Sequence, residues 1–128
     1  GVKRFVELPV SGAFHSPLMQ PAADRMQDLL RDARIEKPSV PVITNVSAVP
    51  EDDPNVLRAD LIKQITHPVR WTESMGSLVN ADIGQAVEVG PGSVLKGLMR
   101  RIARGVTVLG AGTVDDIEQT AAQLKGEN

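Results

Sequence analysis

The chain has 128 residues, of which 41% are hydrophobic, and its formal net charge is −2 at pH 7. That length suits one hydrophobic core, and the charge implies no bulk affinity for nucleic acid. The absence of cysteine excludes disulfides and thiolate metal sites, and two histidines are too few for an ordinary zinc site. No apolar run approaches the roughly 20 residues of a membrane span, so we expect a cytoplasmic protein.

The first part of the chain predicts a strand followed by a helix. The strand is expected over residues 5–10, and the helix from Pro17 to about Ala33. Ser16 is expected to cap this helix through its hydroxyl, and Pro17 suits the first helical position because its missing N–H costs nothing there. Apolar residues recur on one helical face at Leu18, Ala22, Met26, Leu29 or Leu30, and Ala33.

The rest of the chain is predicted as alternating strands and helices. Strands are expected over 40–45, 86–89 and 106–109, and helices over 57–65, 71–79, 93–103 and 113–124. Residues 45–54 read as a polar loop, and Thr113 as the cap of the last helix. Short apolar strands separated by helices indicate an α/β protein with a parallel sheet, which is small or incomplete because so few strands are present.

His15 lies on the loop directly before the first expected helix. The positive end of that helix disfavours an imidazolium, and a neutral imidazole on a fixed loop is what a general base requires. An incidental histidine in a capping loop explains the same pattern. No serine lies in G-x-S-x-G and there is no cysteine, so a catalytic His15 needs a nucleophile from another piece of chain. His67, before Pro68, is expected to cap helix carbonyls.

Two further features have both a functional and a structural interpretation. The corner over residues 88–93 could bind an anion through free N–H groups, although it lacks the lysine of a P-loop and the third glycine of a dinucleotide fingerprint. A tight structural turn is the alternative. Lys96, Arg100 and Arg104 follow four-residue spacing, which predicts either a solvated helix face or a surface that docks an acidic partner.

Four segments, in this order, resemble the malonyl-CoA:acyl carrier protein transacylases of type II fatty acid synthesis. They are P-V-S-G-A-F-H-S-P-L-M (9–19), V-P-V-I-T-N-V (40–46), Q-I-T-H-P-V-R-W (64–71) and E-V-G-P-G-S-V-L-K-G-L (88–98). The resemblance implies part of an α/β-hydrolase-like acyltransferase core, with parallel strands and flanking helices. Residues 1–10 would end an inserted ferredoxin-like small subdomain, and residues 11–128 would form the C-terminal part of the core.

The resemblance also implies roles for single residues. His15 matches the catalytic histidine, which takes the serine proton and returns it to the leaving thiolate of coenzyme A, and Gln64 matches the position whose main-chain carbonyl orients that histidine. Asn45 matches a position that lines the site. Phe14 resembles malonyl-selective members, in which a bulky ring leaves no room for an α-methyl group.

The activity implied is malonyl transfer from coenzyme A to the phosphopantetheine thiol of acyl carrier protein, by a Ser–His ping-pong mechanism. Malonyl-CoA is a substrate, and no resident cofactor or metal is expected. The family's G-H-S-x-G nucleophile, oxyanion-hole glutamine and carboxylate-binding arginine would lie upstream, so we expect this chain alone to be inactive. The partners would be acyl carrier protein, docked on Lys96, Arg100 and Arg104, and a coenzyme A thioester, with no nucleic acid or membrane. The alternative is a non-catalytic α/β module that binds an acidic protein through the same basic residues.

Overall fold

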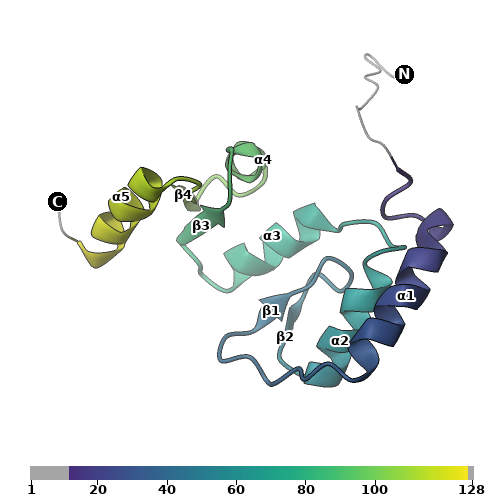
Figure 1. Ribbon diagram of the computed structural model, residues 1–128. Helices are drawn as coiled ribbons and strands as arrows, with labels where there is room; N and C mark the ends of the chain where they lie inside the picture. The colour runs from purple at the N-terminus through teal and green to yellow at the C-terminus, as the bar shows by residue number, and fades with distance from the viewer. Residues whose placement is uncertain (1–11, 127–128) are drawn as a thin grey trace, which may run out of the picture. The chain divides into compact units, whose positions relative to one another are not determined.

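A computed structural model describes residues 12–126 of the chain (Figure 1). These residues divide into two compact units, the first ending at Arg70 and the second beginning at Trp71. The strand expected over residues 5–10 lies outside the described residues. The predicted boundary between residues 1–10 and 11–128 lies there too, and it stays a prediction.

The first unit opens with a short 3₁₀ helix, η1 (Pro17–Met19), that leads directly into helix α1 (Gln20–Arg31). The helix is confirmed, but its first turn is tighter than predicted. Pro21 is the reason, because it has no N–H to donate to the Pro17 carbonyl as an α-helix would require. The Gln20 N–H bonds to that carbonyl instead, which gives the 3₁₀ pattern.

Helix α1 packs against helix α2 (Pro54–Lys63) (Figure 1). The Arg58 guanidinium of α2 donates to the main-chain carbonyls of Leu30 and Ala33, so it satisfies acceptors that the end of α1 leaves open. The predicted apolar face is wrong at Leu18, which is 79% exposed. Of the two leucines left open by the prediction, Leu30 is the one that is partly buried.

Helix α2 begins three residues before the predicted start at Leu57. Asp53 caps it by accepting the N–H of Asn55 at 2.7 Å, and Pro54 occupies the first helical turn, where proline is favoured. Asp53 and Pro54 therefore mark the start of α2, which the pattern of apolar residues did not indicate.

Two very short strands follow α1 in the chain. β1 (Val42–Ile43) pairs antiparallel with β2 (Pro50–Glu51). β1 confirms the strand expected over 40–45 in shortened form, whereas β2 lies in the segment that was predicted as loop. The loop prediction failed there because two residues, one of them a proline, give no alternating pattern to detect.

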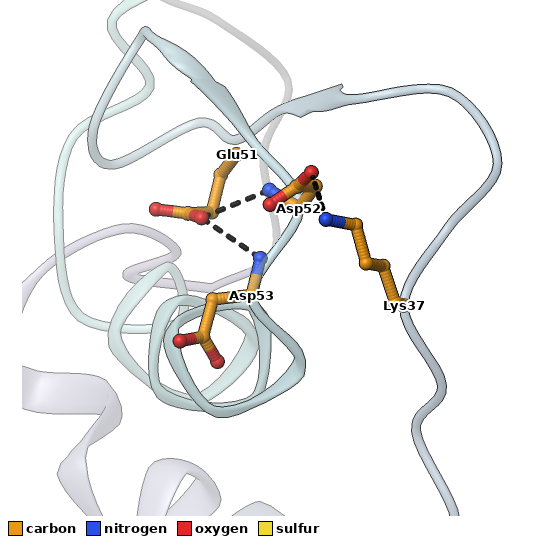
Figure 2. A network of polar contacts seen from close by, with 4 residues as sticks. All are labelled: Lys37, Glu51, Asp52 and Asp53. Carbon is orange, nitrogen blue, oxygen red and sulfur yellow. Dashed lines mark hydrogen bonds and ion pairs between the residues drawn. The ribbon is translucent and has the colours of Figure 1, made fainter.

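A polar network surrounds β2 (Figure 2). Lys37 Nζ lies 2.7 Å from Asp52 Oδ2, and Glu51 Oε1 accepts the N–H groups of Asp52 and Asp53 at 2.8 and 2.9 Å. The hydrogen bond and the negative charge of Asp52 raise the pKa of the Lys37 ammonium above its ordinary value of 10.5. The ion pair links the segment after α1 to Asp52, the residue directly after β2.

The second unit consists of α3 (Trp71–Asn80), β3 (Gln85–Val89), α4 (Val94–Ile102), β4 (Thr107–Ala111) and α5 (Val114–Lys125). β3 and β4 are parallel, with Gln85 opposite Thr107 and Val89 opposite Ala111. Parallel strands joined by a helix confirm the predicted α/β class, and all five elements lie within a few residues of their expected places. None of the helices within residues 12–126 has the length and apolar character needed to cross a membrane.

The core of this unit forms around the α3 and α4 helices. Met75, Met99 and Ala103 are buried together, and Trp71, Leu78, Val106 and Val108 pack against them. Thr113 caps α5 as predicted, because its hydroxyl accepts the Asp116 N–H while the Asp116 carboxylate accepts the Thr113 N–H. This reciprocal capping box fixes the start of α5 directly after β4.

Candidate active site

His15 lies in the loop before η1, with a left-handed backbone conformation of φ = 59°. The Ser16 hydroxyl donates to the Ala13 carbonyl at 2.7 Å and does not cap the helix, so that prediction is wrong. The Met19 N–H, which a capping hydroxyl would accept, instead bonds to the main-chain carbonyl of Ser16 at 3.0 Å. Pro17 occupies the first helical turn, as predicted.

The His15 ring is held by a main-chain acceptor 49 residues away. Its Nδ1 lies 2.8 Å from the carbonyl oxygen of Gln64. A carbonyl can only accept, so the hydrogen bond requires the proton to be on Nδ1. In the neutral ring this leaves Nε2 unprotonated, with its lone pair available. This is the protonation pattern that a general base requires.

The Gln64 carbonyl is available because of its place in α2. Gln64 is the residue directly after the last helical one, and its N–H donates to the Asp60 carbonyl at 2.9 Å. The last carbonyls of a helix have no partner within the helix and carry its partial negative charge. The carbonyl that faces His15 therefore lies at the negative end of α2. The electrostatic field of this helix end cannot be inferred from the position of His15 in the sequence.

The second histidine binds the neighbouring carbonyl of the same helix end. His67 Nδ1 lies 2.8 Å from the Lys63 carbonyl, which confirms the prediction that His67 caps helix carbonyls. The two histidines thus contact consecutive main-chain oxygens, those of Lys63 and Gln64. His67 returns to its own helix, whereas His15 arrives from a distant loop.

Asn45 lies directly after β1 and contacts the same glutamine through its side chain. Asn45 Nδ2 donates to Gln64 Oε1 at 3.0 Å. One helical turn earlier on α2, Thr44 Oγ1 donates to the Asp60 carboxylate at 2.6 Å. Two successive loop residues therefore hold Asp60 of α2 and Gln64, the residue directly after this helix. These two residues are four positions apart and lie on the same side of the helix.

Two clefts of the first unit meet at Gln64. One, of about 320 Å³, is bordered by Phe14, His15, Met19, Ala22, Met26, Gln64 and Ile65. The other, of about 440 Å³, is lined mainly by apolar residues, with Thr44, Asn45, Asp60 and Gln64 as its polar groups. The structure thus brings the four predicted residues Phe14, His15, Asn45 and Gln64 to adjoining clefts.

The Phe14 ring is 61% exposed at the border of the smaller cleft. It lies so close to Gly12 that a Cβ on Gly12 would be 3.1 Å from Phe14 Cε2. Because Gly12 has no side chain, it leaves space for the Phe14 ring. This gives the glycine of the S-G-A-F-H segment a steric role next to the histidine.

Sequence reasoning missed Asp60 and Thr44. Asp60 is 5% exposed although it is a carboxylate, and its partner Thr44 comes from another segment. A signal was present, because Asp60 lies three residues after Leu57 and thus on the buried face of α2. An acidic residue at such a position needs a partner.

The predicted docking residues lie in the second unit. Lys96 and Arg100 are on α4, but Arg104 is two residues beyond the helix end at Ile102, so the three do not form one continuous helical face. Their side chains are exposed, and within residues 12–126 the ion pairs found involve none of them.

The glycine-rich corner before α4 is a structural turn. The Glu88 carboxylate accepts the N–H groups of Leu95 and Lys96 at 2.9 and 3.0 Å, so donors at this helix start that an anion would need are already bonded. Gly90 and Gly92 adopt φ values of 116° and 95°, which other residues rarely adopt. These observations favour the tight-turn interpretation over the anion site.

In comparisons of sequence and of structure with known proteins, the chain matches malonyl transacylases. The Bacillus subtilis (strain 168) malonyl CoA-acyl carrier protein transacylase is 38% identical over all 128 residues, which correspond to 40% of its own length. The crystal structure of the acyl-carrier-protein S-malonyltransferase from Bartonella henselae superposes on 97% of the chain and 39% of that protein, with 43% identity and a TM-score of 0.87.

A type II polyketide acyl-carrier protein in complex with its malonyl-transacylase gives a similar match, which covers 98% of the chain and 40% of the transacylase, with 33% identity and a TM-score of 0.87. No protein-family model matches the sequence. The structural matches place the chain in the class of α/β acyltransferases. Within that class it is similar over its whole length to the malonyl-CoA:acyl carrier protein transacylases, and it spans about 40% of the length of the curated relatives it matches.

Proposed function

We propose that this chain supplies the general base for malonyl transfer from coenzyme A to the phosphopantetheine thiol of acyl carrier protein. The observation that carries the proposal is the hydrogen bond between His15 Nδ1 and the Gln64 carbonyl, which leaves Nε2 free to accept a proton. The names of the relatives support the reaction. The serine nucleophile would come from the part of such proteins that this chain does not cover.

In the first half-reaction, Nε2 takes the proton of the serine hydroxyl as the serine oxygen attacks the malonyl thioester carbonyl. The resulting imidazolium gives that proton to the sulfur of coenzyme A as the carbon–sulfur bond breaks. In the second half-reaction, Nε2 takes the proton of the phosphopantetheine thiol as its sulfur attacks the malonyl ester, and the serine oxygen leaves with the proton. The negative end of α2 at Gln64 stabilises each imidazolium.

The remaining parts of the proposal concern specificity and partners. Phe14, at the border of the smaller cleft beside His15, would exclude an α-methyl group, and Asn45 belongs to the polar part of the larger cleft. Lys96, Arg100 and Arg104 would attract the acidic carrier protein by electrostatic steering. The chemistry needs only side chains and a thioester substrate, so we propose no resident cofactor. As a separate point, we propose a cytoplasmic location.

The test is a chimera in which these 128 residues replace the aligned segment of the Bacillus subtilis relative. We expect the chimera to transfer malonyl groups to holo-acyl carrier protein, and His15→Ala to reduce kcat/KM by roughly 10²–10⁴-fold, the usual contribution of a general base. The matched control is His67→Ala, which removes the histidine on the adjacent carbonyl and should leave the rate nearly unchanged. A chimera that keeps its full rate with His15→Ala would refute the proposal.

A further inference from the structure

We propose that Asn45 is a positioning residue, whose side-chain amide holds Gln64 and thereby the carbonyl that orients His15. This inference rests on the proposed function of His15 as a base. It also gives Asn45 a different role from that of a residue that lines the site and contacts substrate.

The argument starts from two hydrogen bonds in series. Asn45 Nδ2 donates to Gln64 Oε1 at 3.0 Å, and His15 Nδ1 donates to Gln64 O at 2.8 Å. Gln64 thus receives one bond on its side chain and one on its main chain. The three residues come from three separate segments of the first unit, so this pair of bonds links the histidine loop, the end of α2 and the segment after β1.

Gln64 needs such a contact because it lies past the end of its helix. Residues at helix ends fray and lack the repeated bonds of the interior. The turn after α2 has some support of its own, since Ile65 and Thr66 donate to Ile62 and Lys63 at 3.3 and 3.1 Å. These bonds hold the following residues, whereas the bond from Asn45 is made to the side chain of Gln64 itself.

Asn45 is itself well fixed, which allows it to act as an anchor. Its carbonyl accepts the Arg70 N–H at 3.1 Å, and the Arg70 guanidinium donates to the carbonyls of Val46 and Ser47 at 3.2 and 3.0 Å. On its other side, Thr44 is bonded to the buried Asp60. The anchor is therefore held by main-chain and side-chain bonds on both flanks.

The expected chemical effect is on the tautomer of His15. While the Gln64 carbonyl is in place, the neutral ring carries its proton on Nδ1 and keeps Nε2 free. If the carbonyl turns away, the ring is released to the Nε2–H tautomer, which cannot accept a proton at the reacting position. Loss of the Asn45 contact should therefore lower kcat, with little effect on KM.

The experiment determines the tautomer of each histidine by ¹⁵N NMR of the 128-residue chain at alkaline pH, where both rings are observed in the neutral form. In the unchanged chain we expect His15 to be mainly the Nδ1–H form. Asn45→Leu should shift His15 toward the Nε2–H form. His67, which binds the Lys63 carbonyl without Asn45, is the internal control and should not change.

Three further variants make the result specific. Gln64→Met keeps the carbonyl but loses Oε1, and it should cause the same shift as Asn45→Leu. Asn45→Asp should keep the Nδ1–H form, because the Gln64 amide can turn and donate to the new carboxylate. Thr44→Val removes the neighbouring bond to Asp60 but leaves the Asn45–Gln64 bond in place, so it should shift His15 much less than Asn45→Leu does. This separates the Asn45 contact from a general loosening of the segment.

The inference is overturned if His15 keeps its tautomer in both Asn45→Leu and Gln64→Met, or if Thr44→Val shifts it equally. In the chimera, Asn45→Leu should reduce kcat by roughly 10-fold to 100-fold, as small misplacements of catalytic groups do. The two proposals fail separately. If the tautomer shifts but His15→Ala leaves transfer intact, the proposed function fails, and the Asn45 contact orients the His15 ring without a consequence for catalysis. If the tautomer does not shift but His15→Ala abolishes transfer, only the role of Asn45 is removed.

Discussion

At the scale of single residues, the His15 contact uses a main-chain atom as its acceptor. No side-chain substitution at Gln64 can remove that oxygen, whereas one substitution removes the aspartate of a Ser-His-Asp triad. A carbonyl is also neutral, so the orienting group does not titrate. Side-chain changes around the site therefore act on how firmly the acceptor is held.

Lys37 offers a direct test of local electrostatics at the same scale. Asp52 raises the pKa of Lys37, so the stabilisation from this pair is fully present below pH 10.5 and is lost as the pH rises through the higher pKa of the folded state. An NMR titration of the Lys37 side chain should give a pKa above 10.5 that falls toward that value in Asp52→Asn, where only the smaller effect of Asp53 remains. An unchanged pKa in Asp52→Asn would mean that the ion pair in Figure 2 does not form in solution.

At the scale of elements, the start of α4 depends on Glu88 and not on Ser93, the residue at the N-cap position. The Ser93 side chain makes no capping bond, whereas the Glu88 carboxylate accepts two helix N–H groups. Glu88→Ala should lower the free energy of unfolding by about 1 kcal/mol, the usual cost of losing a helix cap.

Urea unfolding followed by the fluorescence of Trp71, which packs in the same unit, measures this loss. Ser93→Ala is the matched control and should change stability by less than about 0.5 kcal/mol. Equal losses in the two variants would show that the carboxylate does not cap α4. Glu88→Gln should fall between the two, because it keeps an acceptor and loses the charge that favours a helix start.

The secondary structure could be predicted from the sequence wherever the apolar periodicity agreed with the capping and turn residues. Helices α3 and α5 have both signals and lie where they were expected. Local chemistry decided the exceptions: Pro21 forced the 3₁₀ turn of η1, and β2 is too short to show a period. Glu88 escaped prediction because its bonds reach seven and eight residues along the chain, beyond any local capping pattern.

At the scale of the whole molecule, the chain carries His15 as a proposed base but no recognisable nucleophile motif. It contains no cysteine and no G-x-S-x-G serine, so we expect it not to form the acyl-serine intermediate of a ping-pong transfer by itself. Incubated alone with malonyl-CoA, it should show no mass increase by intact-protein mass spectrometry, while the chimera should gain one malonyl group. A stoichiometric adduct on the 128-residue chain would show that the nucleophile is among its own serines.

The assembly of the candidate site was beyond local sequence reasoning. His15 and Gln64 are 49 residues apart, and Asn45 and Gln64 are 19 apart, so no spacing rule joins them. The family resemblance supplied the pairing of His15 with the Gln64 carbonyl. The Asn45 contact was not anticipated, because it depends on how the segment after β1 packs along α2.

The left-handed backbone of His15 has a consequence for how this position changes under selection. Most residues with a Cβ lose roughly 1–2 kcal/mol in this conformation. Glycine has no Cβ, and asparagine can form a local hydrogen bond through its short side chain, so both adopt it more readily. In a library of variants sorted for folding alone, position 15 should therefore drift toward asparagine or glycine. When the same library is sorted for malonyl transfer in the chimera, position 15 should return to histidine. Selection then acts on the imidazole ring, despite the unfavourable backbone conformation.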